Sequence, residues 1–280
     1  MNMENISESF IKSILKERSP DSHKGIYGHA LLIAGNTGKM GAAVIAAKAC
    51  VRSGVGLVTV NSPFMERLTI QVSVPETMLN FREYLPDNYD NFSAIGIGPG
   101  IGKNSLEKKV LKQIIKYSAK PIVLDADALN IIAGAKKMLA NIPANSIITP
   151  HPKEFDRLFG IHSSTEERKD TAIKIAMDLN IVIVLKGHQT FVTNGSDQFI
   201  NTTGNSGLAK GGSGDALTGL ITGLLAQKYE SINAALLAVY IHGLAADIAL
   251  EKQTTETLII VDVIENFGKA FKQIIKTQSP

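Results

Sequence analysis

Short apolar runs alternate with segments of helical periodicity along most of the chain. The apolar runs are continuous stretches rich in Val, Ile and Leu, which is typical of strands that are covered on both faces. We expect such strands at residues 30–35, 56–60, 94–98, 121–127, 146–150 and 181–187. Because helical segments follow most of them, the pattern predicts an α/β fold in which helices cover both sides of a mainly parallel sheet, in three layers.

Residues 190–203 depart from this pattern, because two stretches with polar alternation flank the sequence NGSD. Such an arrangement predicts a β-hairpin. The chain of 280 residues contains no internal repeat, Pro-rich linker or low-complexity block. We therefore expect a single domain over residues 1–280.

The composition is typical of a soluble globular protein, with 44% hydrophobic and 20% charged residues. A formal net charge of +3 is too small to indicate binding to nucleic acid, and no long Lys/Arg run is present. The single cysteine, Cys50, excludes a disulfide within the chain and argues against a Cys-based zinc site. It lies in an apolar helical segment, where we expect a small buried side chain.

No segment indicates secretion or a membrane span. The N-terminal residues carry acids early and lack a long apolar stretch, so they do not resemble a signal peptide. The most apolar long segment, residues 234–250, contains the acid Asp247 and fits a buried helix better than a membrane span. We expect a cytoplasmic protein.

Polar side chains follow the ends of several predicted strands. In mainly parallel sheets, ligands bind beyond the carboxyl ends of the strands. Turn chemistry explains the glycines in these loops, but it does not explain charged groups and an imidazole at the same edge. These groups are Asp125, Asp127, His151, Glu154 and Lys186.

The most specific local signal is AKGGSGDALTG, residues 209–219. Its glycines let backbone N–H groups approach an anion, and the apolar helix that follows adds its dipole. The spacing matches neither a Walker A loop nor a dinucleotide fingerprint. Asp215 has two interpretations here. It is either a helix cap, or a base for a hydroxyl that attacks phosphorus while the loop amides hold the transferring charge.

The motif GGSGD before an apolar helix resembles the anion-hole and catalytic-base signature of ribokinase-like kinases. A wider set of segments, in consistent order over roughly residues 25–250, is similar to the ADP-dependent (S)-NAD(P)H-hydrate dehydratase family of bacteria. The segments are GHALLIAG, GAAVIAAKACVRSGVGLVTV, PET, GIGPGIG, PIVLDADALN, ITPHPKEFDRL, VLKGHQTFV and NSGLAKGGSGDALTGLITGLLAQ.

This resemblance implies a ribokinase-like αβα sandwich and a reaction that repairs damaged nicotinamide cofactor. The S-epimer of a 6-hydroxy hydrate of NADH or NADPH (NADHX or NADPHX) is phosphorylated on its hydroxyl by ADP, which is released as AMP. Phosphate then leaves, helped by the ring nitrogen, and NADH or NADPH is restored. The resemblance further implies Mg²⁺ as cofactor, a homotetramer and a separate upstream epimerase. The apolar helices at 41–51 and 234–250 would allow a subunit interface.

The resemblance also assigns roles to individual residues. Asp215 is the base that takes the hydroxyl proton. The anion hole is formed by Gly212, Ser213 and Gly214. The positions that contact the adenine nucleotide are Lys186, Gly187, His188, Gln189, Thr190 and Gly214. The positions that bind the hydrate are Ala43, Gly102, His151 and Asp215. No side chain binds the metal directly, and Glu154 acts on it through water.

Other interpretations stay open at several of these positions. Ala43 is equally suited to a helix core and Gly102 to a turn, and Ala42 and Gly100 lie one register step away from them. His151 lies between two prolines after a strand, which makes a purely structural role harder to assign.

The carboxylates are also ambiguous. Asp125 and Asp127 can orient a loop, cap a helix or hold a magnesium-bound water, whereas Asp247 and Asp262 receive no chemistry. Lys153 replaces the Gly that is usual in the family's PHPGE motif, which raises a question about the conformation of that loop and its phosphate contact.

Two other functions fit parts of the sequence. GGSGD alone allows a ribokinase-like kinase of a vitamin-precursor alcohol, although KGHQT and PHPKEF argue against it. A nucleotide sensor without catalysis would also keep this fold, but it has no need for Asp215. The preferences for ADP over ATP and for NADHX over NADPHX cannot be read from residues.

Overall fold

The computed structural model describes residues 3–84 and 88–276. The strands are β1 Glu4–Asn5, β2 His29–Ile33, β3 Leu57–Ser62, β4 Met78–Phe81, β5 Ala94–Ile97, β6 Ile122–Leu124, β7 Ile147–Ile148, β8 Val182–Leu185, β9 Thr190–Thr193 and β10 Gln198–Asn201. The helices are α1 Glu8–Ile14, α2 Met40–Val51, α3 Arg67–Ser73, α4 Ser105–Tyr117, α5 Ala126–Ala133, α6 Pro152–Phe159, α7 Thr165–Leu179, α8 Ser213–Ala226, α9 Ser231–Ala249, α10 Ile260–Glu265 and α11 Phe267–Lys276. Short 3₁₀ turns are η1 Lys24–Tyr27, η2 Phe64–Glu66, η3 Lys136–Asn141 and η4 Ser206–Leu208.

The described strands form one ten-stranded sheet in the order β1-β10-β9-β8-β7-β6-β5-β2-β3-β4. Every pair from β8 through β7, β6, β5, β2 and β3 to β4 is parallel. Strand β9 is antiparallel to both of its neighbours, β8 and β10. The predicted hairpin at 190–203 is therefore confirmed, and it extends an otherwise parallel sheet at one side.

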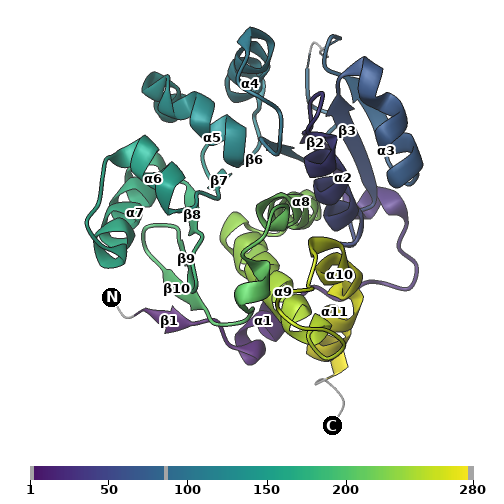
Figure 1. The fold of residues 1–280 in the computed structure, drawn as a ribbon, viewed down its shortest axis with the longest axis vertical. Helices are drawn as coiled ribbons and strands as arrows, with labels where there is room; N and C mark the ends of the chain where they lie inside the picture. Colours follow the sequence, from purple (N-terminus) through teal and green to yellow (C-terminus); the bar gives the residue numbers. More distant parts are fainter. Residues whose placement is uncertain (1–2, 85–87, 277–280) are drawn as a thin grey trace.

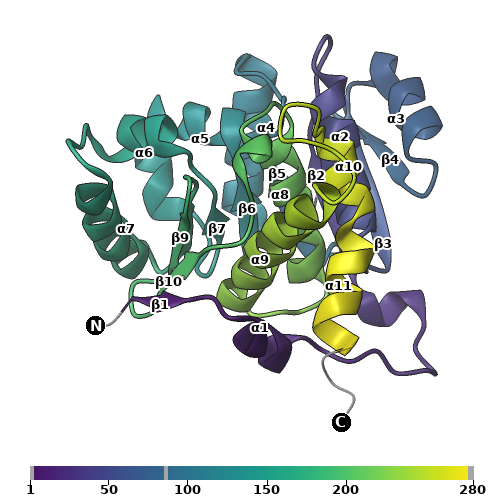
Figure 2. The same cartoon turned by 60° about the horizontal axis from the view of Figure 1, so that its bottom comes forward.

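Alternate residues of the strands point into two separate cores. Ala30 and Leu32 of β2 pack in a core with α2, α8, α9, α10 and α11. Leu31 and Ile33 of the same strand pack in the other core, with α4, α5, α6 and α7. Helices therefore cover both faces of the sheet, as Figures 1 and 2 show, and the predicted three-layer α/β architecture is confirmed.

The apolar helix predicted at 234–250 lies inside the molecule. Helix α9 is the one described helix that is long and apolar enough to cross a membrane, but 78% of its most apolar window is buried within the fold. Cys50 is also fully buried, in α2, which confirms the predicted structural role of its side chain. Burial raises the pKa of its thiol, which keeps it in the neutral form.

Most of the strands end earlier than the apolar runs predicted, whereas β3 extends to Ser62, beyond the predicted run 56–60. The run 121–127 contributes only Ile122–Leu124, because Asp125 is already the N-cap of α5. The runs at 146–150 and 181–187 likewise shorten to β7 and β8. The residues released from the strands form the loops at one edge of the sheet, where the candidate site lies.

Candidate functional site

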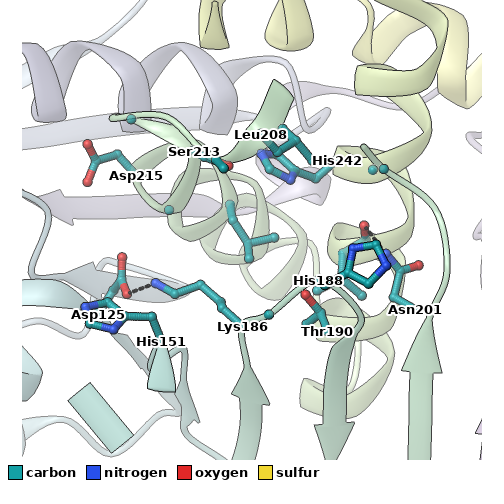
Figure 3. A pocket seen from close by; sticks show the side chains of 18 of the residues that line it. Asp125, His151, Lys186, His188, Thr190, Asn201, Leu208, Ser213, Asp215 and His242 are labelled. Carbon is teal, nitrogen blue, oxygen red and sulfur yellow. Dashed lines mark hydrogen bonds and ion pairs between the residues drawn. The ribbon is translucent and has the colours of Figure 1, made fainter. Parts of the chain in front are cut away.

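A pocket of about 670 Å³ opens where the predicted strand ends meet the N-terminus of α8. Asp125, His151 and Asp215 lie toward one side of this pocket, and His188, Asn201 and His242 lie toward the other, with Lys186 between them (Figure 3). Glu154 also lines it. The groups that the sequence placed at one edge of the sheet are thus brought together, with the exception of Asp127.

Lys186 is paired with a buried carboxylate. It follows β8, and its Nζ lies 2.8 Å from Oδ1 of Asp125, which is 1% exposed. Oδ2 of Asp125 accepts a hydrogen bond of 2.9 Å from the hydroxyl of Thr218 in α8. A largely buried ammonium needs an anionic partner, and Asp125 supplies it. An ammonium has three donors, so Lys186 keeps donors for a ligand phosphate.

The N-terminus of α8 has the geometry of an anion-binding site. Gly212 is its N-cap, with φ 93°, and a Cβ there would lie 2.7 Å from Cδ1 of Ile45. A Cβ at Gly214 would lie 3.2 Å from Nζ of Lys186. The first turn of a helix leaves N–H groups without intrahelical acceptors. The predicted anion hole, Gly212 to Gly214, therefore presents such groups directly beside the Lys186 ammonium.

Asp215 is the third residue of α8 and not its cap, because Gly212 occupies the N-cap position. Within the described part of the chain, no hydrogen bond engages the Asp215 carboxylate, which lines the pocket. Burial, with Asp125 as a second cause, raises its pKa from 3.8 to about 6, and Lys186 partly opposes this. A carboxyl without a structural partner and with a pKa near neutrality has the properties of a general base.

His151 and Glu154 form a reciprocal cap at the start of α6. Nδ1 of His151 accepts from the N–H of Lys153 at 3.2 Å, and the N–H of His151 donates to Oε2 of Glu154 at 2.9 Å. Since Nδ1 is an acceptor, Nε2 carries the proton in the neutral ring. Desolvation lowers the pKa of His151, so the neutral ring is favoured. The imidazole thus has a structural role in the cap, and its Nε2 lies 3.5 Å from Oε1 of Glu154 at the pocket.

Lys153 does not disturb this loop. It lies in the first turn of α6, and its φ is not among the positive values of the described residues. The backbone therefore has no requirement for the glycine that is usual in the resembling family. The side chain is exposed beside the pocket.

The part of the pocket to which the resemblance assigns the nucleotide has more lining residues than the sequence predicted. Gly187, His188 and Thr190 line it together with Lys186, whereas Gln189 is exposed outside it. The residues that sequence reasoning missed are Asn201, Thr203, Asn205, Leu208, Val239 and His242. The end of β10 could have indicated the first two, since it is one more strand end at this edge.

Asp247, to which the sequence assigned no chemistry, holds part of this wall in place. Its Oδ2 accepts from the N–H of Gly204 at 2.8 Å, and its Oδ1 accepts from Nδ2 of Asn205 at 2.9 Å. The loop before η4 is thereby fixed against α9.

Ala43 and Gly102 do not line the pocket. Ala43 is fully buried in the core beneath the loop, and Gly102 donates its N–H to Oδ2 of Asp127 at 2.9 Å. Asp127 is two residues beyond Asp125, and its Oδ2 lies 3.6 Å from Nζ of Lys39. Gly102 therefore contacts Asp127, which does not line the pocket either, and the predicted hydrate-binding roles of Ala43 and Gly102 stay predictions.

The protein groups fit a metal ion that arrives with the nucleotide. Among residues 3–84 and 88–276, no three His, Cys, Asp or Glu side chains are placed to hold an ion together. The pocket carboxylates Asp125 and Glu154 already have protein partners. Mg²⁺ commonly keeps several waters and binds one or two carboxylates together with substrate phosphates, which agrees with this arrangement.

Sequence comparison identifies the family. A family model described as NAD(P)H-hydrate dehydratase matches residues 30–266. An ADP-dependent (S)-NAD(P)H-hydrate dehydratase of Bacillus subtilis is 34% identical, over 97% of this chain and 100% of the relative. One from Neisseria meningitidis is 37% identical, over 85% and 82%. A bifunctional NAD(P)H-hydrate repair enzyme of Moorella thermoacetica is 33% identical over 93% of this chain, which spans only 52% of that relative.

Solved structures agree with this result. The ADP/ATP-dependent NAD(P)H-hydrate dehydratase from Bacillus subtilis, co-crystallised with ATP/Mg²⁺, has a TM-score of 0.87 at 32% identity and covers 98% of this chain and 99% of its own. A ribokinase-like superfamily protein from Enterococcus faecalis has a TM-score of 0.85 at 26% identity, over 97% and 96%. The predicted ribokinase-like fold is therefore confirmed, and the chain belongs to the NAD(P)H-hydrate dehydratase family.

Proposed function

We propose that this protein is an ADP-dependent (S)-NAD(P)H-hydrate dehydratase, which converts the S-epimer of NADHX or NADPHX to NADH or NADPH with release of AMP and phosphate. The observation that carries the proposal is the position of Asp215. Its unpaired carboxyl lies at an anion-binding helix N-terminus, in the same pocket as the Lys186 ammonium. A base beside an anion hole is what phosphoryl transfer to a hydroxyl requires.

The chemistry proceeds in two steps. The ring hydroxyl oxygen attacks the terminal phosphorus of ADP while Asp215 takes the hydroxyl proton, and the bond from that phosphorus to AMP breaks. Negative charge on the transferring group is held by the N–H groups of Gly212 to Gly214 and by Lys186. The phosphate ester then breaks at carbon, helped by the ring nitrogen, and loss of one ring proton restores the double bond.

The pocket supports a division between two substrates. Asp215 and His151 lie on the side where we propose that the nicotinamide ring binds, and we propose that the imidazole of His151, held beside Glu154, contacts the hydrate. His188 and Thr190 lie toward the opposite side (Figure 3), where we propose that ADP binds, with its phosphates at Lys186 and Gly187 between the two sides. Gly214 is between the two, within reach of the transferring phosphoryl group.

Mg²⁺ would neutralise part of the negative charge on the phosphates of ADP. We propose that it is held chiefly by the phosphates of ADP and by water, and that Glu154 and Asp125 orient that water. Glu154 is 5% exposed, so its carboxylate orients neighbouring groups with little competition from bulk solvent.

A homotetramer is part of the proposal, and we propose for it a surface other than the apolar helices at 41–51 and 234–250. The apolar residues of helices α2 and α9 pack mainly in the core of this chain. Exposed apolar side chains gather instead on η2, α3 and β4, at the free end of the strand order. They are Phe64, Met65, Leu68, Val72 and Met78. We propose that this edge packs against another copy of the chain.

An upstream epimerase and a cytoplasmic location complete the proposal. An enzyme that accepts only the S-epimer needs a second activity to recover the other epimer. The bifunctional relative, of which this chain covers about half, is described as a repair enzyme, which agrees with such a pairing.

The assay that tests the proposal combines the protein with S-NADHX, Mg²⁺ and either ADP or ATP. We expect the NADH absorbance to return with ADP, and no return in the absence of nucleotide. A protein that binds ADP but restores no NADH with either nucleotide would contradict the proposed activity.

A further inference from the structure

His242 is a buried polar side chain that the proposed chemistry does not use. It lies in α9, lines the same pocket and is 6% exposed. Within the described residues, its buried Nε2 has no hydrogen-bond partner. Nitrogen and oxygen atoms buried in proteins nearly always have a partner, and a lone one marks a site where a ligand or water completes the bonding.

The His242 ring is uncharged at neutral pH. Burial, together with the nearby Lys186 ammonium, lowers its pKa from 6.5 to about 4. A neutral imidazole offers one N–H donor and one acceptor, and it attracts phosphate far less than an ammonium does. The chemistry of this group therefore suits a neutral ligand that has both donors and acceptors.

Apolar side chains share the pocket with His242. Leu208, Leu217 and Val239 line the same pocket. One wall is tightly fixed, because a Cβ at Gly243 would lie 2.3 Å from Oγ1 of Thr203, and Asp247 holds the adjoining loop. Apolar walls with a few fixed polar groups are typical of sites for flat heterocycles.

The pocket separates this region from the phosphate-binding groups. Figure 3 shows Asp215 and the Lys186–Asp125 pair on one side, and His242 with Asn201 and His188 on the other. A nucleoside diphosphate has the same polarity, with charge at one end and a neutral ring at the other. Its phosphates would lie at Lys186 and the N-terminus of α8, which places its base near His242.

We propose that His242 is the residue that recognises the purine base of the nucleotide, through a hydrogen bond to the donor and acceptor edge of adenine. The inference rests on the proposed nucleotide-binding function and adds a specificity-determining residue to it. Adenine then supplies the bonding partner that the imidazole lacks in the protein alone.

The test replaces the imidazole with an apolar group of similar size, His242→Leu. Binding is measured by calorimetry and thermal shift, with ADP and with ribose 5-diphosphate, which has no base. We expect ADP affinity to fall about tenfold while affinity for ribose 5-diphosphate is unchanged. The variant without ligand should melt at the wild-type temperature or above it, because removing an unpartnered buried polar atom costs no hydrogen bond.

Tyr240→Phe is the matched control, since Tyr240 is equally buried in α9 but does not line the pocket. It should bind both probes as the wild type does. If His242→Leu does not fold, His242→Asn takes its place in the same comparison. Asn keeps a donor and an acceptor at the site, so we expect its loss of ADP affinity to be smaller than tenfold.

Two outcomes would overturn the inference: unchanged ADP affinity in the variant, or an equal loss for both probes. Neither measurement needs the hydrate, so the result does not depend on turnover. If the wild-type protein itself binds no ADP, the proposed function fails and not only the role of His242.

Discussion

The chemistry of Asp215 depends on the residues that surround it. The sequence alone left capping and base catalysis open, because both place an acid at a helix start. Two facts that only the structure supplies separate them: Gly212 is the cap, and the carboxyl has a raised pKa because it is buried near Asp125. His242 could not be predicted at all, since a histidine in an apolar helix is ordinarily a core residue.

Asp215→Asn should reduce turnover by about 10²–10⁴-fold, because the amide cannot accept the hydroxyl proton. ADP affinity should be kept or improved, since one negative charge near the phosphates is removed. In the wild type, kcat/KM should rise with pH through about 6, where Asp215 loses its proton, and then level off. Steady-state kinetics across pH checks this. A profile that is flat through that range would argue against Asp215 as the base.

The stability of this variant separates the base from a structural acid. A folded-state pKa raised from 3.8 to about 6 means that the folded protein binds the proton more tightly than the unfolded chain does. The carboxylate therefore destabilises the fold above pH 6, and this cost disappears below the unfolded value. At neutral pH, the free energy of unfolding of Asp215→Asn should be at least that of the wild type. The gain should be at most on the order of 1–3 kcal/mol. A clear loss of stability would favour a structural role.

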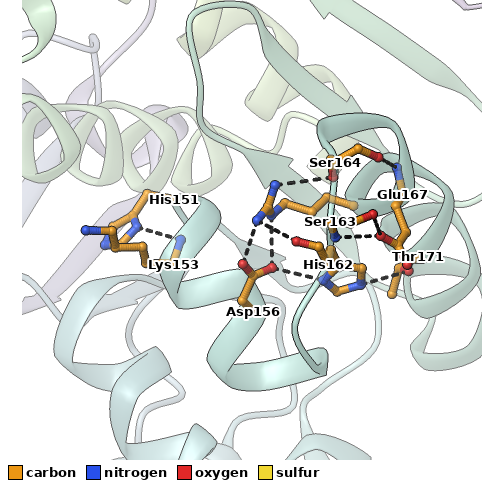
Figure 4. A network of polar contacts seen from close by, with 9 residues as sticks. His151, Lys153, Asp156, His162, Ser163, Ser164, Glu167 and Thr171 are labelled. Atoms are coloured by element: carbon orange, nitrogen blue, oxygen red, sulfur yellow. Dashed lines mark hydrogen bonds and ion pairs between the residues drawn. The ribbon is translucent and has the colours of Figure 1, made fainter.

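At the scale of elements, the sequence predicted strands and helices well where the apolar runs were long. It missed β1 and β4, which are short and lie at the two ends of the sheet. It also missed a network that joins α6 to α7 (Figure 4). Asp156 of α6 accepts from Nε and Nη2 of Arg168 at 2.9 and 2.7 Å, and from Nδ1 of His162 at 2.9 Å. Such contacts join residues whose sequence spacing carries no signal.

Asp156→Asn should destabilise the protein at neutral pH by about 1–3 kcal/mol, because the amide removes the negative charge and replaces one of the two acceptor oxygens that Arg168 and the largely buried His162 share with a donor. Hydrogen bonds from Arg168 are the main cause of the lowered pKa of Asp156. A lowered carboxyl pKa stabilises the fold above the unfolded value of 3.8, and this contribution is lost as pH falls through the folded value. The difference from wild type should therefore shrink in acid. Denaturant unfolding at several pH values checks this, with Asp170→Asn, an exposed acid on α7, as the control. Equal stability of the two variants would refute the role of the network.

At the scale of the whole molecule, local patterns predicted the fold class but not the strand order. The strand order changes direction at β5-β2-β3, where β2 pairs with β5 and not with a strand that precedes it in the sequence. Apolar periodicity does not specify which strands become neighbours. Apolar patterning also does not specify an association surface, because it cannot tell a helix buried in its own fold from one buried against a partner. The single domain stays a prediction, which the continuous ten-stranded sheet supports.

The association surface can be tested with Leu68→Glu combined with Val72→Glu, which places charges on the exposed apolar face of α3. We expect the wild type to sediment as a tetramer of the 30.0 kDa chain and the double variant as smaller species. Ile161→Glu, at a side chain that is 94% exposed elsewhere, should leave the assembly intact. A monomeric wild type, or dissociation by Ile161→Glu alone, would contradict the proposed interface.

The central claim is that a phosphoryl group passes from ADP to the hydrate in this pocket and leaves as phosphate. Phosphorus NMR of one reaction with S-NADHX, ADP and Mg²⁺, recorded together with NADH absorbance, follows both halves of that claim. We expect AMP, inorganic phosphate and NADH in equal amounts, and formation of all three about 10²–10⁴-fold slower with Asp215→Asn. Accumulation of a stable phosphorylated alcohol, or return of NADH while ADP stays intact, would contradict it.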